Sequence, residues 1–483
     1  MKKIACFVLA CIVFATGFIF YACKKEENAH NRYEITVEYA EETKTLMGTM
    51  KVAFENVTDN EISVLKFLLY PNAYRKNALY SPISNATAGE AYYNGESYGE
   101  IVISSVQGGK NWEVMGEDEN VLYVYLERSL FPGDSVVLDI GFITKLADVN
   151  HRTGATMSAI NLGNFYPVLC GIKDGGFVET IYHEIGEPFY LDYADYKVSL
   201  SLPKEYVVVS TGALLEERTL ESKTTYTMYA TNVRDFAMIL SKSFRIEEAE
   251  VDGKRICYFY YEDDAPQKTL EMMKECFSFY EEKFGAYPHP MYAMAQSGLC
   301  LDATRFSCLS FLSDKCADEN KARIIAREIA RQWSGMGVGM DPITNAWQEE
   351  GLAEYMALTF FENYEKYGWA RDGLLKEAML EYRSYYDVYG SVLGRTDTRM
   401  TRDLGEYLSE YEYKCLARDK AVVMLDSLRK SIGDEKFFAS LKRYYRENAH
   451  RQTATGDLIA SFEKTGVDVG GFFDGFLSGK GIL

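Results

Sequence analysis

The hydrophobic pattern of this 483-residue chain changes its period near residue 250. From Tyr33 to about that point, apolar and polar residues alternate in short runs separated by turn residues, for example in Tyr33–Tyr39, Val121–Leu126 and Tyr196–Leu202. A period of two places alternate side chains on opposite faces of a strand. Residues 33–250 are therefore predicted to form a mainly antiparallel β domain.

Helical spacing follows this point. Asp264-Ala-Pro266 is typical of a helix start with proline in the first turn. Because the pattern stays mostly helical to the end, residues 251–483 are predicted to form a second, mostly helical domain, which makes the chain a multidomain α+β protein. In the first helix of this domain, apolar residues recur every three or four positions, at Leu270, Met273, Phe277, Tyr280 and Phe284.

Composition excludes several classes of protein. Apolar residues make up 47% of the chain and charged residues 25%, so it is neither disordered, nor collagen-like, nor a polytopic membrane protein. The formal net charge is −19. A surface of this sign repels nucleic acid, and no stretch of the sequence forms a basic stripe. We expect no nucleic-acid partner.

The N-terminus predicts export and tethering. The uncharged apolar run 4–22 is near the minimum length for crossing a bilayer. The two lysines that precede it favour an N-terminus on the cytoplasmic side. Cys23 follows the run as in a bacterial lipoprotein signal, although Phe20 and Tyr21 are unusual in that motif. Two alternatives stay open for residues 1–23: a signal with a lipidated Cys23, or an uncleaved transmembrane helix. With residues 24–32 as a tether, the body is expected at the extracytoplasmic face of the cell membrane.

Cysteine and histidine supply no obvious metal or redox motif. Seven cysteines lie beyond residue 23, and none forms a C-x-x-C pair, so buried free thiols are predicted. The chain has only five histidines, and no two are spaced as a ligand pair.

The most informative motif lies in Ala326–Gly335 and Trp347–Tyr355. These segments resemble the zinc helices of the membrane alanyl aminopeptidase (aminopeptidase N-like) family of gluzincin metallopeptidases. That family carries H-E-x-x-H, a gap of 18 residues and then a glutamate. Residues 332–349 form a gap of the same length between Arg331 and Glu350. Both histidine positions, however, are occupied by arginine, at Arg327 and Arg331.

Further segments extend the resemblance over nearly the whole exported body. Asn164–Leu169 and Tyr190–Val198 are similar to the family's N-terminal β domain, and Phe472–Gly481 is similar to the end of its catalytic domain. The resemblance implies an N-terminal antiparallel β-saddle domain followed by a thermolysin-like, mostly helical domain of the catalytic type.

The family's zinc chemistry does not carry over to these residues. The resemblance puts Glu328 at the general-base position and Glu350 at a zinc-ligand position. A guanidinium stays protonated and offers no lone pair, so Arg327 and Arg331 cannot replace imidazole ligands. Although the family uses zinc, no metal and no other cofactor are predicted for this chain.

Two further family positions also contain arginine. Alignment puts Arg305 where the family's glutamate holds the substrate amine, and Arg418 where its transition-state tyrosine lies. Tyr413 matches a second family tyrosine. Glu354, one helical turn after Glu350, is expected to accept from a guanidinium, whereas Arg323 is expected to be solvated.

Two interpretations of these charges stay open. Arginine–glutamate pairs could replace the metal as a staple between helices, since the sum of charges stays near zero. Alternatively, Arg305 and Arg418 could line a binding cleft for an acidic peptide or another anionic ligand, because the planar guanidinium group can donate two parallel hydrogen bonds to a carboxylate or a phosphate.

The leading functional hypothesis is a catalytically inactive homologue that works as a membrane-tethered binding or scaffold module. One alternative is an active zinc-dependent aminopeptidase with an atypical site. A second alternative is an accessory subunit of a membrane complex such as a transporter, which an exposed apolar patch on the β domain would favour.

Overall fold

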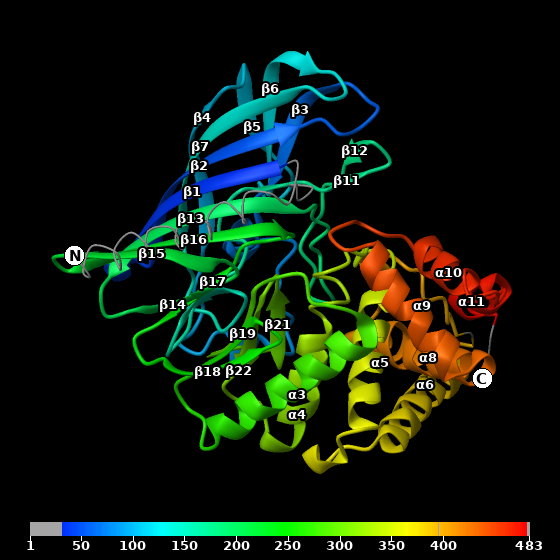
Figure 1. Ribbon diagram of the computed structural model, residues 1–483. Coiled ribbons are helices and arrows are strands. Elements are labelled where there is room, and N and C mark those ends of the chain that lie inside the picture. Colours follow the sequence, from blue (N-terminus) through cyan, green and yellow to red (C-terminus); the bar gives the residue numbers. More distant parts are fainter. Residues whose placement is uncertain (1–30, 395, 481–483) are drawn as a thin grey trace, which may run out of the picture.

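The computed structural model describes residues 31–394 and 396–480. Figure 1 shows the strands of the first half on one side of the molecule and the helices of the second half on the other. The predicted anchor 1–23, with Cys23, and most of the predicted tether lie outside the described residues. Within the described part of the chain, no helix is both long enough and apolar enough to cross a membrane.

A seven-stranded sheet forms the largest part of the β domain. Its order is β15-β16-β13-β1-β2-β7-β4, and only the β1–β13 pair is parallel. Buried and more exposed residues alternate along β1, as the period of two predicts. The mainly antiparallel prediction is confirmed. The strands are β1 Asn31–Ala40, β2 Thr45–Glu55, β4 Glu100–Gln107, β7 Ser135–Lys145, β13 Ala194–Pro203, β15 Ala213–Leu220 and β16 Lys223–Val233.

Smaller sheets pack beside it. One has the order β10-β3-β6-β5, another β14-β17-β9-β8, and β11 pairs with β12 in a short hairpin. The strands are β3 Ile62–Leu68, β5 Asn111–Met115, β6 Val121–Leu130, β8 Thr153–Ala155, β9 Ile160–Leu162, β10 Val168–Leu169, β11 Ile172–Lys173, β12 Gly176–Phe177, β14 Val207–Ser210 and β17 Met238–Ser241, and a single helical turn, α2, covers Ala88–Ala91.

The second domain starts with a sheet of its own, ordered β18-β19-β20-β22-β21. The predicted boundary at residue 250 falls inside β18, which pairs with β19, so the change of sheet lies a few residues earlier. Sequence period alone misses this because β18 continues the alternation of the β domain. The strands are β18 Arg245–Val251, β19 Lys254–Tyr260, β20 Met291–Ser297, β21 Ala303–Phe306 and β22 Leu309–Ser313.

Helices complete this domain. The predicted first helix is confirmed as α3, which begins at Pro266 and buries all five of the apolar positions that defined it. Every residue of α5 is buried, so α5 is the central helix of the domain. The helices are α3 Pro266–Phe284, α4 Asp318–Ala330, α5 Ala346–Phe361, α6 Arg371–Leu393, α7 Glu410–Tyr413, α8 Lys420–Ile432, α9 Asp434–Glu447, α10 Thr455–Glu463 and α11 Gly470–Leu477, with a π-helical segment, η5, at Lys414–Asp419.

All seven cysteines beyond residue 23 are free thiols. Five are buried and two, Cys300 and Cys316, are partly buried. This confirms the prediction of packed, unpaired cysteines.

Candidate functional site

The two segments of the predicted motif lie on α4 and α5, which pack together. Arg331 caps the C-terminal end of α4 and extends toward α5. Its Nη2 lies 2.5 Å from Oε2 of Glu350, and its Nη1 lies 3.2 Å from Oε1 of Glu328. Arg331 is 7% exposed and Glu328 is fully buried, so both contacts are shielded from water. Of the two interpretations that the sequence left open, the arginine–glutamate pairing between helices is present.

Arg327 makes longer contacts from the same helix. Its Nε lies 3.7 Å from Oε1 of Glu328, and its Nη1 lies 3.9 Å from Oε2 of Glu354. These distances exceed hydrogen-bonding range. Glu354 instead accepts from Arg323, whose Nε and Nη2 lie 2.9 and 2.7 Å from Oε1. Glu354 thus accepts from a guanidinium as predicted, but the expectation of a solvated Arg323 is wrong.

The arginines keep these buried carboxylates ionised. Burial alone would raise the pKa of Glu350, but the charges of Arg331, Arg305 and Arg327 outweigh it and hold the pKa below its usual value. Burial likewise opposes ionisation of Glu354, yet the neighbouring guanidinium groups, Arg323 first, lower its pKa to about 2. The cluster is therefore a set of charge pairs at neutral pH.

Arg305 lies on β21, the edge strand of the five-stranded sheet. Its Nη1 lies 2.8 Å from Oε1 of Glu187, and its Nη2 contacts Oε1 of Glu349. Arg152 also contacts this oxygen of Glu187. Burial opposes the charge of Arg305, but Glu349 and Glu187 outweigh it and raise the pKa of this guanidinium. This chain of charges connects the β domain to α5.

A tight loop brings Glu187 into the site. Gly186 has a φ of +71°, and a Cβ there would lie 2.7 Å from Cδ2 of Leu404 and 3.2 Å from the ring of Tyr413. Glycine is needed because both the left-handed backbone and the close approach exclude a side chain. Tyr413 is 9% exposed, and its pKa is raised well above the usual value by burial and by Glu350. Tyr413 is therefore buried beside the charged cluster.

Arg418 lies in the π-helical segment, where Nε donates to Oδ1 of Asp419 at 2.9 Å. Burial opposes its charge, but the nearby Glu354 and Asp419 outweigh this effect and raise its pKa. Its nearest partner is thus its own neighbour in sequence. Arg418 adds positive charge beside Glu354 without contacting Glu350.

Little space remains around Arg305. The cavity that reaches Arg305, Glu187 and Glu349 has a volume of about 10 Å³, enough for about one water molecule. Arg305 is 5% exposed and lies between two carboxylates. It therefore does not form the open anion site that its charge suggested from sequence.

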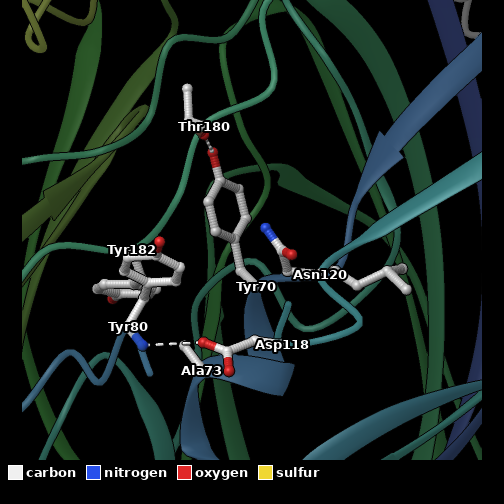
Figure 2. A pocket seen from close by; sticks show the side chains of 8 residues that line it. Tyr70, Ala73, Tyr80, Asp118, Asn120, Thr180 and Tyr182 are labelled. Atoms are coloured by element: carbon white, nitrogen blue, oxygen red, sulfur yellow. Dashed lines mark hydrogen bonds between the residues drawn. The ribbon is translucent and has the colours of Figure 1, made fainter. Parts of the chain in front are cut away.

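A second void of this size lies inside the β domain (Figure 2). The hydroxyl groups of Tyr70 and Thr180 are hydrogen-bonded at 3.0 Å, and the backbone N–H of Tyr80 donates a hydrogen bond to Asp118 at 2.8 Å. With about 10 Å³ of space, this pocket is a packing defect rather than a ligand site.

Zinc does not fit the side chains at the family's ligand positions. Glu328 and Glu350 are already paired with Arg331, and the two guanidinium groups have no lone pair to donate. Among the described residues, no group of three or more His, Cys, Asp or Glu is arranged to hold a metal ion. No catalytic step through zinc can be derived from this geometry.

Comparison with known proteins supports the architecture. Residues 268–476 match the family described as Peptidase family M1 domain. The match covers less than half of the chain, so it shows that the second domain resembles the M1 peptidases. Aminopeptidase M1-A of Oryza sativa subsp. japonica is 25% identical over 292 residues, which are 56% of this chain and 32% of that protein. Aminopeptidase N of Streptomyces lividans is 25% identical over 210 residues, which are 41% of this chain and 24% of that protein. The M1 homologue described here thus matches about a third or less of the length of these relatives.

Solved M1 structures share the fold over nearly their whole length. The M1 zinc metallopeptidase from Deinococcus radiodurans superposes with a TM-score of 0.65 at 18% identity, covering 94% of this chain and 95% of that one. A mutant of that enzyme bound to a Tyr-Ser-Ala substrate gives a TM-score of 0.64 at 16% identity, with the same coverage. The predicted order, a β domain and then a mostly helical domain, is confirmed.

Proposed function

We propose that this M1 homologue is catalytically inactive and works as a binding or scaffold module, tethered at the extracytoplasmic face of the cell membrane. The observation that carries the proposal is the contact of Arg331 with both Glu350 and Glu328. A cation that the protein itself supplies occupies the position where the family's metal would be expected, and it holds the family's general-base carboxylate. A base that is paired in this way has no metal-bound water to activate.

Charge balance supports the same conclusion. Zinc with two neutral histidines and two carboxylates sums to about zero, and so do Arg327 and Arg331 with Glu328 and Glu350. Random loss of ligands would leave buried carboxylates without compensation, which is costly. Retention of balance indicates that the helices were kept packed after catalysis was lost.

The contacts of Arg305 give a second, independent argument. The resemblance assigns this position to recognition of the substrate amine, for which a carboxylate is needed. Here a guanidinium stands at the position and is held between Glu187 and Glu349. A peptide amine would meet a positive charge and a filled space.

One experiment separates this proposal from an active, atypical metallopeptidase. Chelator-free protein is analysed for metal by mass spectrometry, and hydrolysis of Ala- and Leu-anilides is measured in parallel. We expect neither stoichiometric zinc nor turnover. Stoichiometric zinc with chelator-sensitive turnover would refute inactivity. A variant with both Arg327→His and Arg331→His is expected to bind zinc weakly and to turn over little, because Arg305 still opposes the substrate amine.

A partner protein is the second candidate, as in an accessory subunit of a membrane complex. Met47, Ile143 and Val102 are paired across β2, β7 and β4 and are 49%, 41% and 50% exposed. They make a row of apolar side chains on the outer face of the large sheet. If this row is an interface, Ile143→Lys should abolish site-specific photo-crosslinks from position 102 to membrane proteins. The matched surface variant Leu79→Lys should leave them intact, and equal crosslinking in both variants would exclude the interface.

A further inference from the structure

A cavity of about 310 Å³ is lined by residues that follow α4, and its lining includes none of the residues of the charged cluster. Its apolar wall comes from Phe284 at the end of α3, from Trp333 and Val338 after α4, and from Tyr445 on α9. All four side chains are buried. The indole N–H of Trp333 donates to the carbonyl of Gly285 at 2.8 Å, so this ring is held in place. The size and the rigid apolar lining are those of a small ligand pocket.

This cavity adjoins a much larger groove between the two domains. The groove has a volume of about 1360 Å³ and shares Pro288, Arg446 and Ala449 with the cavity. One wall of the groove belongs to the β domain, including the loop after β2 and the turn between β11 and β12, and the other to the segment that follows α9. In Figure 1 the β11–β12 hairpin extends toward the α9 side of the molecule. A volume above the usual range for small-molecule sites suits a length of chain rather than a compact molecule.

Charges are distributed unequally along the two spaces. Lys442 and Arg446 are the charged residues that line the smaller cavity, whose lining includes no Asp or Glu. Arg446 is 69% exposed and lies 3.2 Å from its sequence neighbour Glu447, and Lys442 donates to the backbone carbonyl of Glu282. Both side chains are long and reach solvent, so they can turn to an incoming anion. Across the groove, the β-domain wall presents Asp59 and Asp174.

We propose that the cavity and the groove together bind the C-terminal end of a peptide. An apolar last side chain enters the cavity, its α-carboxylate meets Arg446 and Lys442, and the preceding residues lie in the groove. Basic residues earlier in the peptide face the acidic β-domain wall. The proposal rests on the binding role proposed above and names its ligand class, but it uses none of the residues of the charged cluster.

The choice of a peptide end follows from the combination of features. An apolar pocket alone can bind any hydrophobic molecule of suitable size, and a surface arginine alone can bind any anion. Here two cations line a largely apolar space, and a much larger groove shares Pro288, Arg446 and Ala449 with it. The ligand that has an apolar group, an adjacent carboxylate and an extended chain is the C-terminal residue of a polypeptide.

The test uses the full-length protein and fluorescein-labelled peptides of sequence Gly-Ser-Lys-Gly-Ser-Leu in a fluorescence anisotropy titration. We expect the free acid to bind at least tenfold more tightly than the C-terminal amide and than a peptide that ends in Asp. N-acetyl-leucine should compete only weakly, because it lacks the chain that occupies the groove. Equal affinity of acid and amide, or competition by N-acetyl-leucine as strong as by the peptide, would overturn the proposal.

Variants locate the site. Arg446→Gln and Lys442→Gln change exposed side chains and should each weaken binding about fivefold or more, and Ala449→Trp should reduce it further by filling the shared opening. Lys436→Gln, an exposed lysine on the same helix, is the matched control and should bind as the wild type does. Unchanged affinity in Ala449→Trp, or absence of binding to the wild type at millimolar peptide, would refute the assignment. Either failure leaves the metal and anilide results untouched, so it is distinguishable from failure of the inactive-enzyme proposal.

Discussion

Replacement of Arg331 by alanine is the sharpest test of the charged cluster. The substitution removes one guanidinium that contacts two carboxylates, at 2.5 Å for Glu350 and 3.2 Å for Glu328. Both carboxylates stay buried, at 8% and 0% exposure, and lose their nearest cation. Because Arg331 is the first of the charges that hold the pKa of Glu350 down, that carboxyl becomes easier to protonate in the variant.

The expected cost follows from the burial. Breaking a buried ion pair by removing one partner costs about 3–5 kcal/mol, since a charge is left without compensation. For a domain of this size, each kcal/mol lowers Tm by about 2–4 °C, so Arg331→Ala should melt roughly 6–20 °C below the wild type. Urea unfolding at pH 7, followed by circular dichroism, gives the free energy, and differential scanning calorimetry gives Tm.

Two further variants make the result decisive. Arg399→Ala removes an exposed arginine, 47% accessible and paired with Asp397, and should cost less than about 1 kcal/mol. Arg331→Met combined with Glu350→Leu removes both charges and should recover much of the lost stability, because a buried pair can be replaced by apolar groups at little cost. If Arg331→Ala were no more destabilising than Arg399→Ala, the staple would be an artefact of proximity and the reasoning would fail.

Three other outcomes are expected. The folded pKa of Glu354, about 2, lies below its ordinary 4.5, so its pairing contributes about 3 kcal/mol above pH 4.5 that is lost as pH falls toward 2. Glu354→Gln should therefore flatten the fall in unfolding free energy measured between pH 5 and 3, and an unchanged slope would contradict the assignment. Gly186→Ala should cost about 1–3 kcal/mol in urea unfolding because of its positive φ and its contact with Leu404; a neutral effect would mean that the loop relaxes freely. The thermal midpoint of the wild type should not move when EDTA is added, and a fall of several degrees would reveal a structural metal.

The fold was largely predictable from periodicity. Alternation in the first half and three- to four-residue spacing in α3 identify strands and helix correctly, because burial on one face imposes both patterns. The boundary was less well predicted: β18 alternates like the β domain yet pairs with β19, and no local pattern records which sheet a strand joins. Pairing between segments distant in sequence decides that question.

The paired charges of the site were predictable from the family motif and, for one residue, from the helix period. Glu354 follows from its helical spacing to Glu350, whereas Arg331, Glu328 and Glu350 were singled out by the resemblance to the M1 motif; the structure brings them together on α4 and α5.

Two members of the site were missed. Glu349 directly precedes Glu350 on α5 but contacts Arg305 instead of Arg331. Glu187 lies in an irregular loop of the β domain and also contacts Arg305. Only the tertiary structure brings Arg305 between them, and this changes its role from a free cation to a buried link between domains.

Arg327 separates contact geometry from net charge. It carries the same charge as Arg331 and lies one helical turn before it on α4, and its nearest carboxylates are likewise on α4 and α5. It reaches its carboxylates only at 3.7 and 3.9 Å, and its Nε has no hydrogen-bond partner among the described residues. If the cluster acted by charge balance alone, Arg327→Ala and Arg331→Ala would cost the same. If close contacts dominate, Arg327→Ala should cost at most about 1 kcal/mol, while Arg331→Ala costs several times more. Equal losses in parallel urea titrations would assign the stability to the summed charge of the helix pair rather than to the Arg331 contacts.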